Sequence, residues 1–354
     1  MTGRKVRFAL VGTGSISQSY AQAFDDHPEA RLVAVADVRA DAARALSERF
    51  HCPSYTSYKA MANNGTRFEA LIICTPPNTH EEISVYFLER KIHVLCEKPL
   101  CLDVAGARRM VQAAQKAVVM LSMGSKFRYV DDVIRAKSIV TSGILGELIL
   151  FENTFASRVD MSARWNANPE ISGGGVLIDN GAHSVDLMRY FLGPLASLQV
   201  VEGKRIQGLA VEDTALMLVR STSGVMGRID LSWSLNKELP SYVNIYGTNG
   251  VVSVGWKESK YRQSSSPDWI VFGKGYDKVQ AFRSQIQNFS RALRGEEALL
   301  ITAEDALASV EVIETAYQAL RQENWVRIAA KRKGSVNIAR ANGQASMQTE
   351  AAGS

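Results

Sequence analysis

The sequence predicts an α/β protein with a doubly wound parallel sheet at the N-terminus and a C-terminal α+β region built on a large, mostly antiparallel open sheet. Three observations predict this fold class. A glycine-rich turn joins the first apolar strand to the first helix. Apolar strands then alternate with helical segments up to about residue 124. From about Glu147 onward, short strands and tight turns dominate instead.

The first element is the continuous apolar run Val6–Val11, the pattern of a strand buried on both faces. It leads into Gly12-Thr13-Gly14-Ser15-Ile16-Ser17, where a helix is expected over about 15–25. A second strand, 32–36, ends at Asp37, which lies 25 residues after Gly12. Strand, glycine turn, helix, strand and acid in this order are the dinucleotide-binding fingerprint of a Rossmann domain.

Each position of the glycine turn has a physical role. Gly12 permits the tight turn, and Gly14 lets the backbone approach a pyrophosphate that the helix N-terminus then faces. Ser17 stands where Gly or Ala is usual, and it is small enough for close packing of helix on strand. The alternative for a bare G-x-G is an ordinary β–α turn.

The alternation continues beyond this motif. We expect helices over about 40–50, 58–63, 81–90 and 103–117, and strands over 70–74, 92–96 and 118–123. In a doubly wound sheet, ligands bind beyond the carboxyl ends of the strands. The residues at those ends are Gly12-Thr13-Gly14, Asp37, Thr75-Pro76-Pro77-Asn78 and Glu97-Lys98-Pro99. They are therefore expected to converge on one crevice.

The second region begins with a helix over about 129–142. Expected strands follow over 148–155, 198–201, 213–221, 225–234, 242–246 and 251–254, and two helices over about 277–294 and 303–321. We predict a Rossmann domain over residues 1–124 and an α+β domain over 125–330. Residues 331–354 are rich in Ala, Gly, Ser, Gln and charge, and this composition predicts a disordered tail.

Composition argues against several classes of partner. The net charge is only +5, and a good part of it lies after Ile328, so no nucleic-acid-binding face is expected. No run of about 18 apolar residues occurs, so no membrane span is expected. Four cysteines without a pairing pattern indicate free thiols in a reducing compartment, and hence the cytoplasm. His93, Cys96 and Cys101 lack the spacing of a zinc site, and no metal is expected.

A helix that begins after Gly173-Gly174-Gly175 carries two acids and a histidine on one face. Asp179 and His183 are four residues apart, and Asp186 lies three further on. A carboxylate beside an imidazole is suited to proton transfer, because the acid orients the ring and the ring exchanges the proton. The alternative is a capped helix with one buried, hydrogen-bonded histidine.

The tripeptide Glu97-Lys98-Pro99 places a lysine at a strand end in the expected crevice. Its ammonium can donate a hydrogen bond to a substrate oxygen and favour a developing alkoxide. Pro99 fixes the backbone, with a cis bond as one option, and Glu97 can pair with a charge or bind a cofactor ribose. The alternative is a surface salt bridge.

Together these segments resemble the glucose-fructose oxidoreductase / inositol 2-dehydrogenase family, often called Gfo/Idh/MocA. The resemblance covers about residues 5–328 and rests on the order and spacing of the motifs above, with Thr79-His80 and Phe127-Arg128-Tyr129. It implies a nicotinamide-dependent oxidoreductase acting on a secondary hydroxyl or ketone of a sugar, sugar derivative or inositol. It further implies a second sheet with one face over the nicotinamide and the other used in a homodimer or homotetramer.

The resemblance also implies roles for individual residues in catalysis and in binding of substrate and cofactor. Lys98, Asp179 and His183 would form the catalytic trio: His183 is the general acid/base, Lys98 holds the reacting oxygen, and Asp179 orients the substrate hydroxyl or the lysine. Expected substrate contacts are this trio with Arg128 and Trp165, whose indole offers an apolar plate for a sugar face. Expected cofactor contacts are Gly12, Thr13, Gly14, Ser15, Ile16, Asp37, Val38, Arg39, Thr75, Pro76, Asn78, His80, Glu97 and Lys98.

Asp37 predicts NAD(H) as the preferred cofactor, because its carboxylate can accept bonds from both ribose hydroxyls and would repel a 2′-phosphate. Arg39 leaves NADP(H) open, since a guanidinium can bind that phosphate. Two other functions remain alternatives: an NAD-dependent glycosidase that oxidises C3 of the sugar transiently, and a non-catalytic nucleotide-binding regulator of the same fold. No member of the trio is replaced, which argues against the regulator.

Overall fold

The computed structural model describes residues 4–322, so the predicted tail lies outside the described residues. Its first sheet has six parallel strands in the order β3-β2-β1-β4-β5-β6, which confirms the predicted doubly wound sheet. The strands are β1 (Val6–Val11), β2 (Ala30–Ala36), β3 (Ser54–Tyr55), β4 (Ala70–Ile73), β5 (His93–Glu97) and β6 (Leu121–Gly124). The order reverses between β1 and β4, and at such a switch point the loops at the carboxyl ends separate and leave a crevice.

The connecting helices of this sheet lie close to their predicted positions. They are α1 (Ser15–Phe24), α2 (Ala40–Phe50), α3 (Tyr58–Asn63), α4 (His80–Leu88) and α5 (Val104–Ala117). Capping side chains explain two of the starts. Ser57 accepts a hydrogen bond from the amide of Lys59 at the start of α3, and Asp103 accepts one from the amide of Gly106 at 2.7 Å in α5.

The second sheet has eight strands in the order β14-β13-β12-β11-β7-β10-β9-β8. All neighbours are antiparallel except β7 and β10, so the predicted mostly antiparallel sheet is confirmed. The strands are β7 (Leu148–Ala156), β8 (Leu195–Glu202), β9 (Thr214–Ser221), β10 (Met226–Ser232), β11 (Ser241–Gly247), β12 (Gly250–Gly255), β13 (Ser259–Gln263) and β14 (Ile270–Gly273). The sequence did not predict β3, β13 or β14.

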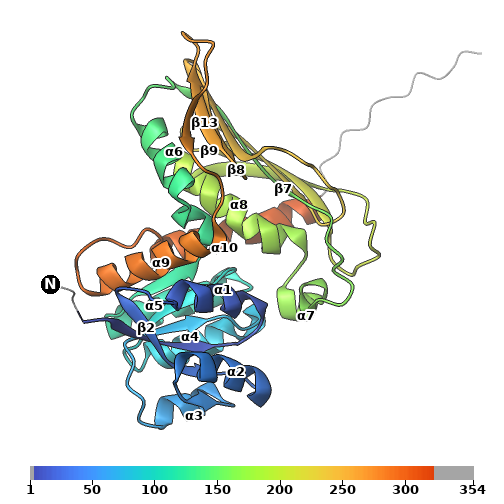
Figure 1. Cartoon of the computed structure of the whole chain (residues 1–354). Coiled ribbons are helices and arrows are strands. Elements are labelled where there is room, and N and C mark those ends of the chain that lie inside the picture. Colours follow the sequence, from blue (N-terminus) through green and yellow to red (C-terminus); the bar gives the residue numbers. More distant parts are fainter. Residues whose placement is uncertain (1–3, 323–354) are drawn as a thin grey trace, which may run out of the picture. The chain divides into compact units, whose positions relative to one another are not determined.

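One face of the second sheet is covered by helices. Figure 1 shows α6 (Asp131–Thr141), α8 (Val176–Leu192) and α10 (Ala303–Gln322) beside this sheet, and each contacts at least one of its strands. In β7, the buried side chains of Phe151, Asn153 and Phe155 alternate with partly exposed neighbours. This period of two is typical of a sheet with a single covered face.

Helix α9 (Lys278–Leu293) follows the second sheet in sequence but packs on the first. Its Phe282, Ile286 and Phe289 share a core cluster with residues of β1 and α1, and the Tyr20 and Phe282 ring centroids are 4.5 Å apart. Residues up to Gln322 fall into one compact unit. A domain boundary at residue 124 therefore stays a prediction.

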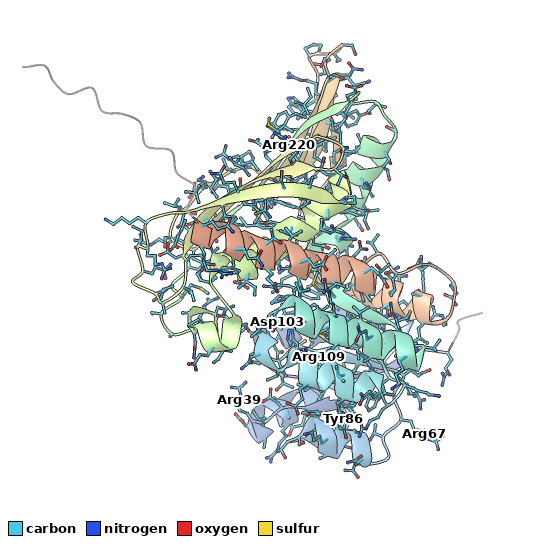
Figure 2. The ribbon with its side chains drawn as sticks, turned by 180° about the vertical axis from the view of Figure 1, so that it is seen from behind. Arg39, Arg67, Tyr86, Asp103, Arg109 and Arg220 are labelled. Atoms are coloured by element: carbon cyan, nitrogen blue, oxygen red, sulfur yellow. The ribbon has the colours of Figure 1, made fainter. Side chains whose placement is uncertain are left out.

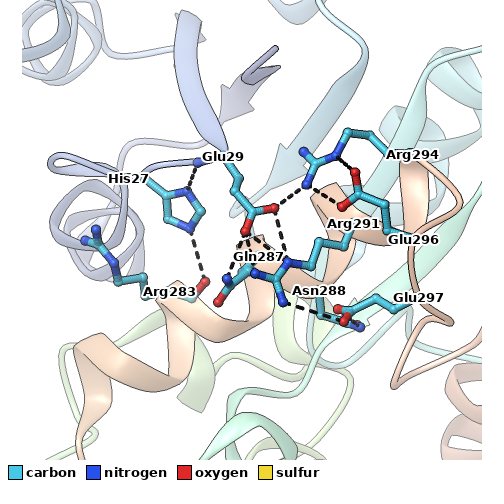
Figure 3. A network of polar contacts seen from close by, with 9 residues as sticks. All are labelled: His27, Glu29, Arg283, Gln287, Asn288, Arg291, Arg294, Glu296 and Glu297. Carbon is cyan, nitrogen blue, oxygen red and sulfur yellow. Dashed lines mark hydrogen bonds and ion pairs between the residues drawn. The ribbon is translucent and has the colours of Figure 1, made fainter. Parts of the chain in front are cut away.

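A polar network fixes α9 to the segment before β2 (Figure 3). The Glu29 carboxylate accepts hydrogen bonds from Gln287 (2.9 Å), from Arg291 (2.7 Å) and from Arg294. The neighbouring His27 ring is buried and accepts a bond from the Glu29 amide at 3.1 Å. No helix among residues 4–322 is long and apolar enough to cross a membrane.

Candidate active site

The glycine turn after β1 has the geometry that a dinucleotide needs. Gly12 has φ +91°, and a Cβ on it would lie 2.6 Å from the carbonyl carbon of Cys74, so only glycine fits there. A Cβ on Gly14 would meet no atom within 4 Å, because this backbone borders open space. A cavity of about 720 Å³ lies there, lined by Ser15 and Ile16 at the start of α1. Helical amides without partners at such a start suit a pyrophosphate.

Asp37 is held rigidly at the end of β2, inside the same cavity. One carboxylate oxygen accepts bonds from the Thr13 amide (2.6 Å) and hydroxyl (3.0 Å), and the other accepts from the Arg39 amide at 2.8 Å. The Arg39 guanidinium, labelled in Figure 2, lies 3.8 Å from this carboxylate and is 63% exposed. Glu82 lines the cavity as a second carboxylate.

Most predicted cofactor contacts border a cavity. Gly12, Gly14, Ser15, Ile16, Asp37, Val38, Arg39, Thr75 and Pro76 line the 720 Å³ cavity, and Glu97 and Lys98 line a second one beside it. Three do not line either cavity. Thr13 is turned toward Asp37, and Asn78 is exposed on η1 (Pro77–Thr79). His80 is buried, and its ring nitrogens contact the carbonyl oxygens of Pro99 (2.9 Å) and Thr75 (2.8 Å), which joins two cavity loops.

The second cavity, of about 330 Å³, brings the predicted trio together. The Lys98 ammonium donates to the Asp179 carboxylate at 2.5 Å and to the Asp179 carbonyl at 3.1 Å. His183 lies one turn further along α8 and lines the same cavity. The Lys98–Pro99 peptide bond is cis. The trio therefore surrounds one small volume between β5 and α8.

The three glycines before α8 let other segments approach its N-terminus. A Cβ on Gly175 would lie 2.0 Å from the Glu212 carbonyl oxygen, and one on Gly174 would lie 1.9 Å from the Tyr317 hydroxyl. The buried Glu212 carboxylate accepts bonds from the Gly175 and Leu177 amides at 2.9 and 3.0 Å. A remote carboxylate thus caps the helix that carries Asp179 and His183.

The environment of His183 keeps its imidazole neutral. The side chain is buried, its Nδ1 lies 3.4 Å from the Ser125 hydroxyl, and the Phe127 ring packs edge-on at 5.0 Å. Burial lowers the pKa of His183 well below its usual range, and the ammoniums of Lys98 and Lys126 lower it further. A neutral ring at pH 7 can accept a proton from a hydroxyl.

Glu97 provides the cavity's other carboxyl group. It is buried, and it accepts hydrogen bonds from the Tyr20 hydroxyl at 2.8 Å and the Lys98 amide at 3.2 Å. Burial raises the pKa of Glu97 despite these bonds. Residues 4–322 hold no group of three or more His, Cys, Asp or Glu arranged for a metal ion.

Two family models match this chain. Residues 6–125 match the model described as "Oxidoreductase family, NAD-binding Rossmann fold", and residues 133–253 match "GFO/IDH/MocA C-terminal domain". Together they cover more than half of the sequence. The chain belongs to the GFO/IDH/MocA family of oxidoreductases.

Proteins with similar sequences match most of the length of this chain. It is 24% identical to an inositol 2-dehydrogenase of Rhizobium meliloti, over 92% of this chain and 99% of that protein. It is 28% identical to a D-glucoside 3-dehydrogenase of Escherichia coli, over 69% and 75% of the two chains. The fold matches that of a levoglucosan dehydrogenase solved with NADH and levoglucosan, with TM-score 0.84, 18% identity, and 91% and 99% of the chains covered.

One predicted substrate contact of this GFO/IDH/MocA chain, Arg128, does not line either cavity. Arg128 is buried outside both cavities, and its Nε donates to the Asp186 carboxylate at 3.1 Å. The same guanidinium donates to the Leu300 carbonyl at 3.0 Å and pairs with Asp305 at 3.3 Å. Its donors are thus committed to neighbouring chain segments, and Arg128 joins α8 to the start of α10. Trp165 does line both cavities, from η3 (Trp165–Ala167).

Sequence reasoning missed several residues of the site. Ser125 and Lys126 follow β6 directly; the Ser125 hydroxyl lies beside His183, and Lys126 lines its cavity. They stand at the carboxyl end of a parallel strand, so the rule that located Lys98 also applied to them. The segment 157–172 after β7 contributes Ser157, Val159 and Met161 to the same cavity, and Trp233 follows β10.

Proposed function

We propose that this protein is an NAD(H)-dependent dehydrogenase that transfers hydride between the nicotinamide and a secondary hydroxyl or ketone of a sugar, sugar derivative or inositol. One observation carries the proposal: Lys98, Asp179 and His183 surround a cavity that adjoins the dinucleotide cavity. The two cavities share Ser15, Ile16, Cys74, Thr75 and Trp165 as lining residues. A substrate carbon between the trio and the cofactor is therefore within reach of both.

Three residues of the chain would have separate roles in the reaction. His183, neutral at pH 7, accepts the hydroxyl proton during oxidation and returns it during reduction. Lys98 donates a hydrogen bond to the same oxygen and stabilises its negative charge. Asp179 holds the lysine at 2.5 Å and so fixes the direction of its ammonium. NAD⁺ bound at the glycine turn supplies the hydride acceptor.

The names of related proteins support the reaction class. The chain is similar to the inositol and glucoside dehydrogenases named above, and the levoglucosan dehydrogenase of the same fold binds NADH with its sugar. Neither the glycosidase nor the regulator has an observation in its favour among the described residues. The family resemblance predicts a homodimer or homotetramer. Light scattering after size-exclusion chromatography tests this prediction by measuring the molar mass in solution.

The function is tested by following NADH absorbance with a panel of inositols and monosaccharides. Lys98→Met and His183→Gln should each lower kcat/KM by about 10²–10⁴-fold, because each removes a group at the reacting oxygen. NADH binding should stay within about threefold of wild type, since the pyrophosphate lies elsewhere. Lys116→Met, at an exposed position on α5, is the matched control. Activity within threefold of wild type in either folded site variant contradicts the assigned roles.

Cofactor choice has its own test. Asp37 places a carboxylate in the dinucleotide cavity, which favours a ribose with free hydroxyls over a 2′-phosphate. Fluorescence titration should therefore show tighter binding of NADH than of NADPH. Asp37→Ala should reduce the difference in affinity between NADH and NADPH, because it weakens NADH binding and relieves the repulsion of NADPH. Tighter binding of NADPH by the wild type would make Arg39 the residue that selects the cofactor.

A further inference from the structure

The cavity of the catalytic trio contains a lysine to which the mechanism above gives no role. Lys126 lines the cavity with Lys98, Asp179 and His183. Its ammonium lies over the rings of Phe127 and Phe282, at 5.3 and 5.9 Å from their centroids. Within residues 4–322 it forms neither a hydrogen bond nor an ion pair. A positive charge thus faces the cavity from a partly buried position beside two aromatic rings.

A partly buried ammonium is costly without an anion beside it. Burial lowers the pKa of Lys126 to about 8, with further lowering by the ammoniums of Lys98 and Lys278 and opposing effects of Glu97 and Asp179. The side chain is therefore still mostly protonated at pH 7. A bound anion would relieve this cost and keep the ammonium charged.

Neither carboxyl group of the cavity forms an ion pair with Lys126, because both are engaged elsewhere. Asp179 is bound to Lys98 at 2.5 Å, and Glu97 accepts from the Tyr20 hydroxyl and the Lys98 amide. Arg164, on the loop after β7, lines the cavity as well and forms no ion pair in the described part of the chain. With His183 neutral, the three basic side chains outnumber the two carboxyl groups. The cavity therefore has an excess of positive charge.

We propose that Lys126 binds an anionic substituent of the substrate, so that the enzyme acts on an acidic sugar or polyol in preference to a neutral one. The inference rests on the proposed function, because it places the substrate in the trio's cavity. A carboxylate and a phosphate share the required chemistry: each offers several acceptor oxygens to one ammonium, with Arg164 as a second contact. The cavity of about 330 Å³ has room for a group of monosaccharide size.

The experiment compares matched substrate pairs that differ by one charged group. The pairs are methyl glucoside with methyl glucuronide, sorbitol with gluconate, and glucose with glucose 6-phosphate, and the readout is kcat/KM with NAD⁺ at pH 7. The wild type should prefer at least one acidic member at least tenfold. Lys126→Met should reduce that preference by roughly 10- to 100-fold, the usual effect of one charge-assisted hydrogen bond. Lys126→Arg should retain most of it, and Lys116→Met should leave it unchanged.

The outcomes separate this inference from the proposed function. Turnover of neutral members with no preference for any acidic one overturns the inference and leaves the dehydrogenase intact. An equal loss on both members of a pair in Lys126→Met also overturns it, because the lysine would then act on the cofactor or the reacting oxygen. If no pair is oxidised, calorimetric titration of the NADH-loaded protein with the same pairs decides the inference. There the acidic member must bind at least tenfold more tightly, and Lys126→Met must abolish the difference. The proposed function itself fails only if the panel of inositols and monosaccharides is not oxidised either.

Discussion

Glu29→Gln should destabilise the protein in a way that depends on pH. The Glu29 carboxylate lies before β2 and accepts hydrogen bonds from three side chains of the α9 region, Gln287, Arg291 and Arg294 (Figure 3). Glutamine keeps the shape of the side chain but removes its charge. The substitution therefore tests how strongly α9 is held to the first sheet by this contact.

The magnitude follows from the acidity of the carboxyl group. Burial alone would raise the pKa of Glu29, but the hydrogen bonds from Arg291, Gln287 and Arg294 outweigh it and lower the pKa from 4.5 to about 2. Such a shift corresponds to about 3 kcal/mol of interaction with the charged form. Glu29 is 17% exposed and Arg291 is 40% exposed, so water screens part of this. We expect Glu29→Gln to cost about 1.5–2 kcal/mol at pH 7.

The sign of the pH dependence is fixed by the same shift. Because the folded-state pKa lies below the unfolded one, the stabilisation is complete above about pH 5 and is lost as the pH falls toward 2. Urea unfolding followed by circular dichroism should show a difference between wild type and variant that shrinks from pH 7 to pH 3.5. Glu296→Gln, on an exposed partner of Arg294, is the control and should have a much smaller effect. A difference below about 0.3 kcal/mol at pH 7, or one that does not change with pH, refutes the reasoning.

Two further predictions concern the site and its support. Burial, Lys98 and Lys126 hold the pKa of His183 well below 6.5, so the acidic limb of kcat/KM for oxidation should lie below pH 6.5. Lys126→Met should move this acidic limb to higher pH, and an unmoved limb contradicts the assignment. Arg128→Met should lower the free energy of unfolding in urea by about 3–5 kcal/mol, because it leaves the fully buried Asp186 without its partner. Arg108→Met is the control, since it removes only an exposed pair with Glu311. A loss below about 1 kcal/mol for Arg128→Met would refute this reasoning.

The sequence was most informative where local physics decides the structure. The bounds of α2 and α3 agree with the prediction, because apolar spacing and the capping residue Ser57 act within one or two turns. It was least informative at β13 and β14. Ser259–Gln263 is largely polar, and its strand conformation depends on pairing with β12, a partner that its own residues do not specify.

The same distinction between local and long-range determinants applies to the site. Lys98 was predictable because a parallel strand directs the residue at its carboxyl end into the crevice, and β5 was evident from its apolar run. The contacts of Arg128 were not predictable, because they depend on Asp186 and Asp305, which are 58 and 177 residues away in sequence. Two acidic partners at such separations are brought together only by the packing of α8 and α10 on the rest of the fold.

Asp186 shows why a shared helix face does not imply a shared site. Asp179, His183 and Asp186 do fall on one side of α8, but seven residues at 1.5 Å each place Asp186 about 10 Å along the axis from Asp179. At that distance it meets Arg128 instead of the cavity. The short segment η2 (Lys126–Tyr129) therefore carries residues for both ends of the face, Lys126 at the cavity and Arg128 at the buried pair. The Arg128–Asp186 pair holds this segment against α8, and through it keeps Ser125 and Phe127 in contact with the His183 ring.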